Sequence, residues 1–474
     1  MSDVQDQHPL LSKHTITHVP YIAPIEIARA WKDKPYLSFL DSAISNTVTV
    51  GDTLGRWSFI AANPCGVFKV IDGVAYWQNQ GMHCSHEMRL DGSPIDALRT
   101  ILKRYHRPLI EGGPPFQGGA IGVFAYDAMH LFEKVPDVGE GAPLNQITLA
   151  FYDRLFACDV VAQKTWWIAP EGVEAPVLND NDLESQIAPI EPIIWQQQCQ
   201  RDVFEQKVAN VIEMIRNGDV FQVNLAHHFV AKFNQPPQAL SIYERLRLAN
   251  PAPFCALLTT PQGFIASTSP ERFLKLTGRH VETRPIKGTR KRYHDKAHDD
   301  ASIQELAASE KDRAENIMIV DLLRNDLSRV CEPHHVDVPQ LCAVESYASV
   351  HHLVSVVTGK LALHHDALDV FAATFAGGSI TGAPKIKAME IIARLESVRR
   401  GAYCGAIGYM DLSGDMDFNI VIRTLVCEGN TLSLHAGGGI TLLSDPVSEY
   451  DETMIKAEKI LNALGTISSN IEQT

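Results

Sequence analysis

Segments of strand-like composition follow one another closely along this chain, and few helical segments separate them. Apolar residues are frequent at 220–233, 255–258, 263–267 and 272–276, with glycine, proline or polar residues between these segments. Parallel strands need a long crossover, usually a helix, between each pair, whereas antiparallel strands need only short turns. The order of segments therefore predicts an α/β protein of the α+β type, with antiparallel sheets and flanking helices, and argues against a doubly wound parallel sheet.

Helical periodicity marks three longer segments. At residues 202–215 apolar side chains share one face, and Asp202 with Glu205 forms a candidate capping arrangement at the start. Residues 302–330 form the longest helical pattern. An amphipathic pattern over residues 446–464 predicts a helix near the end of the chain.

Acidic residues interleaved with proline and asparagine at 171–200 indicate a connection between two regions. The first region, residues 1–190, combines short strand-like segments with turns. The second, residues 191–474, holds the stronger helical and strand patterns. We therefore predict a boundary near residue 190.

Charge and cysteine content exclude several classes of protein. The 56 acidic residues outnumber the 42 basic ones, and a net charge of −14 argues against general nucleic-acid binding. The nine cysteines include no CxxC pair, which fits reduced thiols better than a disulfide framework or a zinc site. No segment is long and apolar enough to span a membrane, and the polar N-terminus lacks the pattern of a signal peptide. We expect a cytoplasmic protein with neither a nucleic-acid nor a membrane partner.

Lys287 lies in the short segment Thr283-Arg-Pro-Ile-Lys-Gly-Thr289. Pro285 fixes the backbone before the lysine, and Gly288 permits a tight turn after it. A lysine held in this way can act as a nucleophile if its surroundings lower its pKa. The local sequence also fits a solvated basic loop, because further basic residues follow at 290–296. Both interpretations stay open at this level.

Carboxylates recur at helical spacing in the last predicted helix. Glu449, Glu452 and Lys456 share one face, since they are separated by three and four residues. They are either a solvent-exposed charge pair or a carboxylate surface for Mg²⁺, which binds oxygen ligands. Glu315 on a second predicted helix would be a further ligand in the latter case.

Other candidate residues also have two interpretations. The three glycines at 437–439 permit either backbone N–H groups that bind an anion or a plain tight turn. Arg423 is a lone arginine in an apolar strand-like run, so we expect a carboxylate partner from the protein or from a ligand. Glu271 could be a general acid if burial raised its pKa, or simply the partner of Arg272. The adjacent His352 and His351 have no third ligand nearby, so a histidine-bound metal is not expected.

Five motifs then occur in one order along the chain. They are Asp321-Leu-Leu-Arg-Asn-Asp326, Gly377-Gly-Ser-Ile-Thr-Gly-Ala-Pro-Lys385, Tyr403-Cys-Gly-Ala-Ile-Gly408, Ile422-Arg-Thr424 and Ala436-Gly-Gly-Gly-Ile440. The set resembles the chorismate-utilising enzymes over residues 200–465, and residues 1–190 resemble, more loosely, the N-terminal part of anthranilate synthase component I. The resemblance implies two large antiparallel β-sheets packed together with flanking helices. It also implies that residues 191–474 are the chorismate-binding catalytic domain.

Within this family Lys287 distinguishes two activities. Anthranilate synthases typically carry alanine there, and ammonia adds at carbon 2 of chorismate. In the aminodeoxychorismate-forming type, the lysine amine adds at carbon 2 as the 4-hydroxyl leaves, and ammonia then enters at carbon 4 and expels the lysine. Gln222 agrees with amination, because the isochorismate and salicylate synthases carry a lysine base at that position. The resemblance implies synthesis of 4-amino-4-deoxychorismate for 4-aminobenzoate and folate, with anthranilate and pyruvate formation as the alternative.

The resemblance also implies roles for individual residues. Glu271 would protonate the departing hydroxyl, and His352 would lie near the ring. Glu315, Glu452 and Glu449 match the Mg²⁺ ligands, the last directly or through water. The residues that would bind the substrate are Ser379, Tyr403, Arg423, Gly437, Gly439, Lys456 and Gln222.

The source of nitrogen lies outside this chain. A glutamine amidotransferase needs a cysteine on a Gly-x-Cys-x-Gly turn, and none of the nine cysteines has that context. Ammonia would therefore come from solution or from a separate glutamine amidotransferase subunit, as the resemblance implies. Relatives also bind tryptophan near a segment that Phe39-Leu-Asp-Ser42 matches, which makes Ser42 a candidate contact for tryptophan as a structural ligand or an inhibitor. A non-catalytic scaffold is disfavoured, because each matched catalytic position retains a competent residue.

Overall fold

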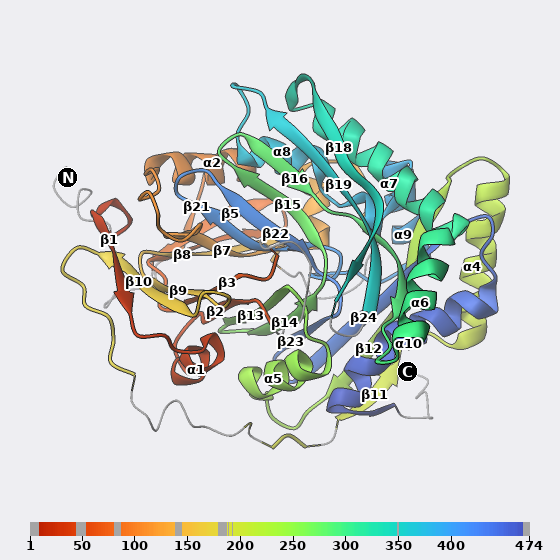
Figure 1. The fold of residues 1–474 in the computed structure, drawn as a ribbon, viewed down its shortest axis with the longest axis horizontal. Coiled ribbons are helices and arrows are strands. Elements are labelled where there is room, and N and C mark those ends of the chain that lie inside the picture. Colours follow the sequence, from red (N-terminus) through yellow and green to blue (C-terminus); the bar gives the residue numbers. More distant parts are fainter. Residues whose placement is uncertain are drawn as a thin grey trace.

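The computed structural model describes residues 9–43, 54–79, 87–137, 145–178, 187, 189–191, 193–347 and 350–467. All of the described strands belong to two large sheets that pack on each other, with helices on their outer faces (Figure 1). Among the described strands every pairing is antiparallel except that of β11 with β25. The predicted pair of antiparallel sheets with flanking helices is therefore confirmed.

The first sheet contains strands from both ends of the chain. In spatial order it runs β1 (His14–Val19), β10 (Lys164–Pro170), β9 (Leu155–Asp159), β3 (Trp57–Ala61), β2 (Ser38–Asp41), β13 (Phe254–Thr260), β14 (Gly263–Ser269), β23 (Thr424–Glu428), β24 (Thr431–Ile440), β12 (Gln222–Lys232), β11 (Ile193–Gln197) and β25 (Gly465–Ile467). The short strand β20 (Gly382–Ala383) also pairs with β12. The predicted strands at 220–233, 255–258 and 263–267 are β12, β13 and β14.

The second sheet is built in the same way. In spatial order it runs β17 (Ile286–Lys291), β19 (Val350–Leu361), β16 (His280–Thr283), β15 (Arg272–Thr277), β22 (Met416–Ile420), β21 (Ala406–Asp411), β7 (Gly119–Phe124), β8 (Ile147–Tyr152), β4 (Gly66–Ile71), β5 (Val74–Asn79) and β6 (Glu87–Arg89). The long strand β18 (Cys331–Ser346) pairs with β19.

Helices cover the outer faces of both sheets. They are α1 (Pro24–Ala30), α2 (Pro94–Arg104), α4 (Arg201–Arg216), α5 (Ala239–Ala249), α6 (Lys296–Ala308), α7 (Glu310–Ser328), α8 (Ala367–Thr374), α9 (Lys385–Glu396) and α10 (Pro446–Leu464), with 3-10 turns η2 (Pro9–Leu11), η3 (Tyr126–Leu131) and η4 (Gly378–Ile380). No helix in the described part of the chain is long and apolar enough to cross a membrane.

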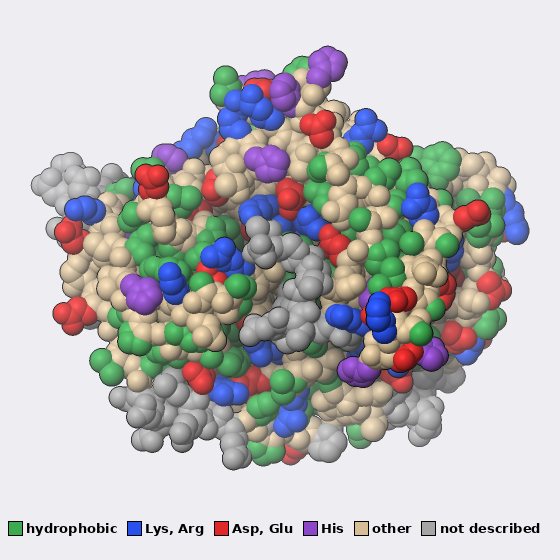
Figure 2. Space-filling view, in the orientation of Figure 1, with side chains coloured by type: hydrophobic (Ala, Val, Ile, Leu, Met, Phe, Trp, Pro, Cys, Tyr) green, Lys and Arg blue, Asp and Glu red, His purple; other side chains and the backbone are tan. Residues whose placement is uncertain are grey.

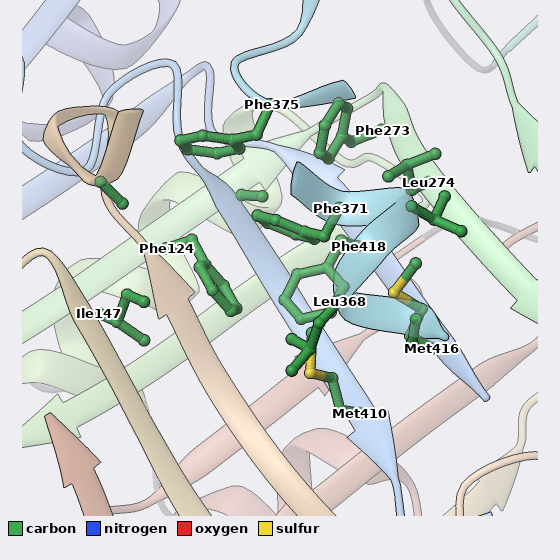
Figure 3. Packing of buried hydrophobic residues seen from close by; sticks show 14 of the residues in the cluster. Phe124, Ile147, Phe273, Leu274, Leu368, Phe371, Phe375, Met410, Met416 and Phe418 are labelled. Carbon is green, nitrogen blue, oxygen red and sulfur yellow. The ribbon is translucent and has the colours of Figure 1, made fainter. Parts of the chain in front are cut away.

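Aromatic side chains fill the space between the two sheets and the space beneath the helices. Between the sheets, the ring of Phe59 on β3 lies 5.6 Å from that of Tyr409 on β21. On the outer face of the second sheet, Phe371 of α8 packs on Phe124 and Phe418, with ring centroids 4.2 and 5.3 Å apart (Figure 3). Burial of such rings is a major source of stability in a core of this kind.

Strands from both sides of residue 190 share both sheets. In the first, β2 pairs with β13, and in the second, β7 pairs with β21. The stretch predicted as a connection at 171–200 also contains β11, which pairs with β12. The two regions are therefore joined by continuous hydrogen-bonded sheets.

Two of the predicted helices differ in detail from the structure. The pattern over 302–330 is not one helix, because it spans α6 and α7, and Ser309 between them accepts a hydrogen bond from the backbone N–H of Asp312. Asp202 does not cap α4, since that helix begins after Gln200 and Asp202 already lies within its first turn. The last helix has the predicted bounds, Pro446–Leu464.

Gly122 on β7 occupies a position where a side chain has no room. A Cβ atom there would overlap the carbonyl oxygen of Thr148 on the neighbouring strand β8. We expect Gly122→Ala to lower the free energy of unfolding by about 1–3 kcal/mol, the usual cost of overpacking a core. Chemical denaturation would measure the change. Gly438→Ala is the control, because its Cβ would meet its nearest atom at 3.4 Å; an equal loss in both variants would contradict the prediction.

Candidate active site

A cavity of about 1300 Å³ lies where both sheets meet helices α7 and α10. Its walls come from β17 and β19 of the second sheet, β24 of the first sheet, the turn η4 and the two helices. It is lined by all of the predicted site residues except Gln222, Glu449 and Ser42. The fold therefore brings together residues that are far apart in the sequence.

Lys287 lies on strand β17, which pairs with β19. The pairing shifts register between Lys287 and Thr289, and Gly288 between them has a φ of +77°. The predicted tight turn after the lysine is therefore wrong, because Gly288 forms a bulge within a strand. A Cβ atom on Gly288 would also approach the carboxylate carbon of Asp312 to 2.8 Å. The bulge fixes the backbone that carries Lys287 against helix α7.

The amine of Lys287 lies among acidic groups inside the cavity. Its Nζ donates a hydrogen bond of 3.1 Å to the carbonyl oxygen of Ser379 in η4. Burial lowers the pKa of Lys287, while the negative charges of Glu315 and Glu271 oppose that shift. A lowered pKa raises the fraction of neutral amine, which is the nucleophilic form. The interpretation of this segment as a solvated basic loop is therefore disfavoured.

Glu271 is a buried carboxyl group beside the lysine. It is only 5% exposed and accepts a hydrogen bond of 2.8 Å from the hydroxyl of Ser379. Burial raises the pKa of Glu271 to about 7, against the opposing effects of the Ser379 hydroxyl and the Lys287 charge. Arg272 does not pair with Glu271; it forms salt bridges with Asp417 and Glu282. Glu271 is thus poised to exchange a proton near neutral pH.

His352 on β19 is buried opposite the bulge. Its Nδ1 shares a hydrogen bond of 2.9 Å with the hydroxyl of Thr289, and the ring of Tyr347 packs edge-on against it. Burial, followed by the charge of Arg423, lowers the pKa of His352 to about 3. The imidazole is therefore neutral at physiological pH and offers both a donor and an acceptor.

The sequence predicted that Arg423 lies in a strand, and this prediction is wrong. Arg423 lies in the break between β22 and β23, with a φ of +52°, and its carbonyl oxygen accepts hydrogen bonds from Thr268. Within the described residues its guanidinium makes no hydrogen bond or ion pair, although it lines the cavity. A partly buried arginine of this kind is ready to bind a carboxylate ligand.

The three glycines at 437–439 lie in strand β24, so the plain tight turn predicted as one alternative is wrong. They line the cavity, and binding of an anion by their backbone stays a prediction. Gly439 and Gly437 pair with Asn224 and Ala226 of β12. A Cβ atom on Gly437 would meet the carbonyl oxygen of Leu225, so this position needs glycine. Glycine here keeps the cavity wall free of side chains.

The carboxylates predicted as metal ligands lie on two facing helices. On α10, Glu449 accepts a hydrogen bond of 2.6 Å from Ser444 and lies 3.5 Å from the amine of Lys311 on α7. Glu452 pairs with Lys456 at 2.8 Å, and Lys456 also donates to the carbonyl oxygen of Gly437. Among the described residues no three metal-binding side chains form a compact cluster. On the face of the molecule drawn in Figure 2, acidic and basic side chains are interspersed.

Glu315 on α7 is the third carboxylate predicted as a metal ligand. It lines the cavity and accepts no hydrogen bond from the residues that the structure describes. Burial raises its pKa, and the nearby charges of Asp312 and Glu449 raise it further, while Lys287 and Lys311 lower it. An oxygen-rich group of this kind has the chemistry that Mg²⁺ prefers.

Two further residues of the cavity were not predicted from the sequence. Asn224 on β12 lines it two residues after Gln222, which is fully buried just outside it. His435 on β24 stacks on the predicted residue Tyr403, with ring centroids 5.2 Å apart. The two-residue period of a strand could have indicated Asn224, since residues two apart share a face.

Ser42 lies away from this site, beside a second cavity of about 90 Å³. That cavity lies between the sheets, near Arg272 and Tyr409. The Ser42 hydroxyl donates a hydrogen bond of 2.7 Å to the carbonyl oxygen of Trp57. A role for Ser42 in binding tryptophan stays a prediction.

Known proteins resemble this chain over most of its length. The model of a family described as chorismate binding enzyme matches residues 56–462. Aminodeoxychorismate synthase component 1 of Salmonella typhimurium is 42% identical over 379 residues, which cover 78% of this chain and 82% of that protein. Anthranilate synthase component 1 of Aquifex aeolicus is 31% identical over 99% of this chain and 98% of its own length.

A solved structure agrees with these sequences. Anthranilate synthase component I from Streptococcus pneumoniae superposes with a TM-score of 0.74 at 30% identity, covering 88% of this chain and 94% of that one. The family match includes the whole cavity described above, with Lys287, Glu271 and the facing carboxylates. From the sequence match, the shared fold and the assembled cavity, we conclude that this chain belongs to the chorismate binding enzyme family.

Proposed function

We propose that this chain converts chorismate and ammonia to 4-amino-4-deoxychorismate, which would lead to 4-aminobenzoate and folate. The observation that carries the proposal is the position of Lys287, a half-buried amine held between Ser379, Glu271 and Glu315 in the cavity. The relatives named aminodeoxychorismate synthase component 1 support it.

The chemistry follows from which groups are adjacent. The neutral amine of Lys287 adds at carbon 2 of chorismate, both ring double bonds shift, the 4-hydroxyl leaves as water after taking a proton from Glu271, and the added nitrogen gives up a proton. Ammonia then adds at carbon 4 and gives up a proton, both double bonds shift back, and the lysine departs from carbon 2 as an amine after taking a proton. Occupation of carbon 2 by the lysine is what directs the nitrogen to carbon 4. The net reaction joins chorismate and ammonia with loss of water.

The acidic groups on α7 and α10 would hold the proposed cofactor. Glu315, Glu452 and Glu449 would be the ligands of Mg²⁺, which would offset their charges and bind one substrate carboxylate. The lack of a hydrogen bond to Glu315 among the described residues supports a cation there. We also propose a separate glutamine amidotransferase subunit as the source of ammonia, since the names of the relatives from Salmonella typhimurium and Escherichia coli read component 1.

Arg423 would bind the other carboxylate of chorismate in a two-pronged contact. We expect Arg423→Gln to raise the KM for chorismate about 10- to 100-fold, because a charge-assisted hydrogen bond contributes about 1.5–3 kcal/mol. Steady-state kinetics would measure it. Arg290→Gln is the control, since Arg290 also lines the cavity but pairs with Glu305 at 2.7 Å. A KM unchanged in the Arg423 variant would contradict this role.

Product analysis tests the proposed function directly. Purified protein would receive chorismate, Mg²⁺ and ammonium, without any partner subunit. The proposal expects a product that yields 4-aminobenzoate after addition of an aminodeoxychorismate lyase. Fluorescent anthranilate would instead support the alternative, to which the Aquifex aeolicus relative belongs by name. In that case Lys287 would not determine the position of amination.

A further inference from the structure

Three amide atoms beside the cavity have no hydrogen-bond partner within the described chain. Gln222 is fully buried with neither Oε1 nor Nε2 bonded, and Asn224, 6% exposed, has an unbonded Oδ1. Buried polar groups are nearly always hydrogen-bonded, because each unpaired one costs roughly 1–3 kcal/mol. Two such side chains in one strand, beside the cavity, therefore make a candidate place for a small polar ligand.

Both side chains face the same wall of the cavity. They lie two residues apart on β12, and Asn224 is directly opposite Gly439 of β24. A Cβ atom on Gly439 would overlap the amide nitrogen of Gln222. The glycine therefore leaves a space in which the Gln222 amide lies beside the cavity wall, next to Asn224, which lines it.

Asn224 is also held at a fixed place relative to Lys287. Its Nδ2 donates a hydrogen bond of 3.0 Å to the carbonyl oxygen of Ile380, while the Lys287 amine donates to the preceding carbonyl, that of Ser379. Two successive carbonyls of η4 thus anchor the asparagine and the lysine. This bond uses one of the two N–H donors of the amide, and its Oδ1 acceptor has no partner among the described residues.

The free atoms decide which ligand fits. The unbonded atoms are two amide oxygens, which accept hydrogen bonds and repel a carboxylate, and the Nε2 of Gln222, which donates; none of them carries a charge. The guanidinium of Arg423 suits the carboxylates of chorismate better. A small molecule with N–H donors fits, and neutral amides bind it without adding a charge. We propose that Gln222 and Asn224 form a subsite for ammonia, the second substrate; this rests on the proposed function. Two N–H groups of ammonia bind the two oxygens, and its lone pair stays free for the ring.

Ammonium kinetics of an Asn224 variant test the subsite. The rate of chorismate consumption would be measured against ammonium concentration at saturating chorismate and Mg²⁺. For Asn224→Leu we expect the KM for ammonium to rise about tenfold, the effect of losing one hydrogen bond, with the Kd for chorismate unchanged. Asn224→Ala gives a second, smaller substitution should the leucine variant fail to fold.

Asn250 provides a matched control. It also lines the cavity, is 8% exposed, and donates from its Nδ2 to Thr268 at 2.9 Å, but it has no unbonded buried oxygen. Asn250→Leu should leave the KM for ammonium unchanged. An unchanged KM in both Asn224 variants overturns the subsite alone and leaves the atoms as contacts of water. A wild-type protein whose chorismate consumption does not respond to ammonium overturns both the subsite and the proposed function.

Discussion

Replacement of Lys287 by alanine is expected to reduce formation of 4-amino-4-deoxychorismate by about 10³-fold or more, in line with the loss of a principal catalytic group. The amine of Lys287 is the proposed nucleophile, and its Nζ donates a hydrogen bond of 3.1 Å to the carbonyl oxygen of Ser379. Without it, ammonia has no covalently occupied carbon 2 to direct it to carbon 4. Binding of chorismate should persist, because Arg423 and Lys456 remain.

Two measurements check this result. The rate of product formation would be followed with the lyase assay, and intact-protein mass spectrometry without ammonium would look for an adduct of chorismate minus water on the wild-type chain only. Lys291→Ala is the control, because Lys291 also lines the cavity but its amine lies over the ring of Tyr293, 5.4 Å from the centroid. Unchanged product formation in Lys287→Ala would exclude the covalent role.

Replacement of Glu271 by glutamine should lower kcat about 10²- to 10⁴-fold, the usual contribution of a general acid. The pH dependence gives a second signature. Burial raises the pKa of Glu271 to about 7, so the carboxyl group is protonated and active below that pH. Activity of the wild-type enzyme should therefore fall as the pH rises through about 7. The variant cannot titrate there and should lose that limb of the profile.

Rate profiles from pH 5 to pH 9 would compare the two proteins. Glu305→Gln is the control, because Glu305 is exposed, pairs with Arg290 and does not itself line the cavity. It should keep both the rate and the limb near pH 7. A limb that persists in Glu271→Gln would assign the titration to another group and remove Glu271 as the acid.

Local sequence patterns were sufficient where local forces decide the structure. The last helix was predicted to the residue because its amphipathic pattern begins after Asp445, which caps it, and ends at Gly465. The pattern over 302–330 was misread as one helix because helical periodicity continues on both sides of Ser309. The break is marked by the extended backbone of Ser309, with φ −65° and ψ 105°, and by the hydrogen bond from the Asp312 N–H to the Ser309 side chain.

Strand pairing between distant parts of the chain determines the local structures that the sequence patterns predicted wrongly. Glycines 437–439 looked like a turn, yet β12, some two hundred residues earlier, pairs with them and makes them a strand. Gly288 likewise forms a bulge only because β19 lies beside it. The resemblance placed Lys287 and Glu271 among the site residues, and the structure brings both to one cavity. The strand period places Asn224 on the same face as Gln222, but only the packing around β12 shows that its Oδ1 is buried without a partner among the described residues.

The sharing of both sheets between the two ends of the chain has a consequence for synthesis in the cell. Phe124 of β7 pairs with Ala406 of β21, which is about 280 residues later in the chain. At the usual rate of synthesis, this edge of β7 therefore stays unpaired for roughly ten seconds or more. Unpaired strand edges of this kind invite aggregation. The newly made N-terminal part therefore carries an unpaired strand edge during synthesis, and the cavity around Lys287 is complete only once β24 and α10 have been made.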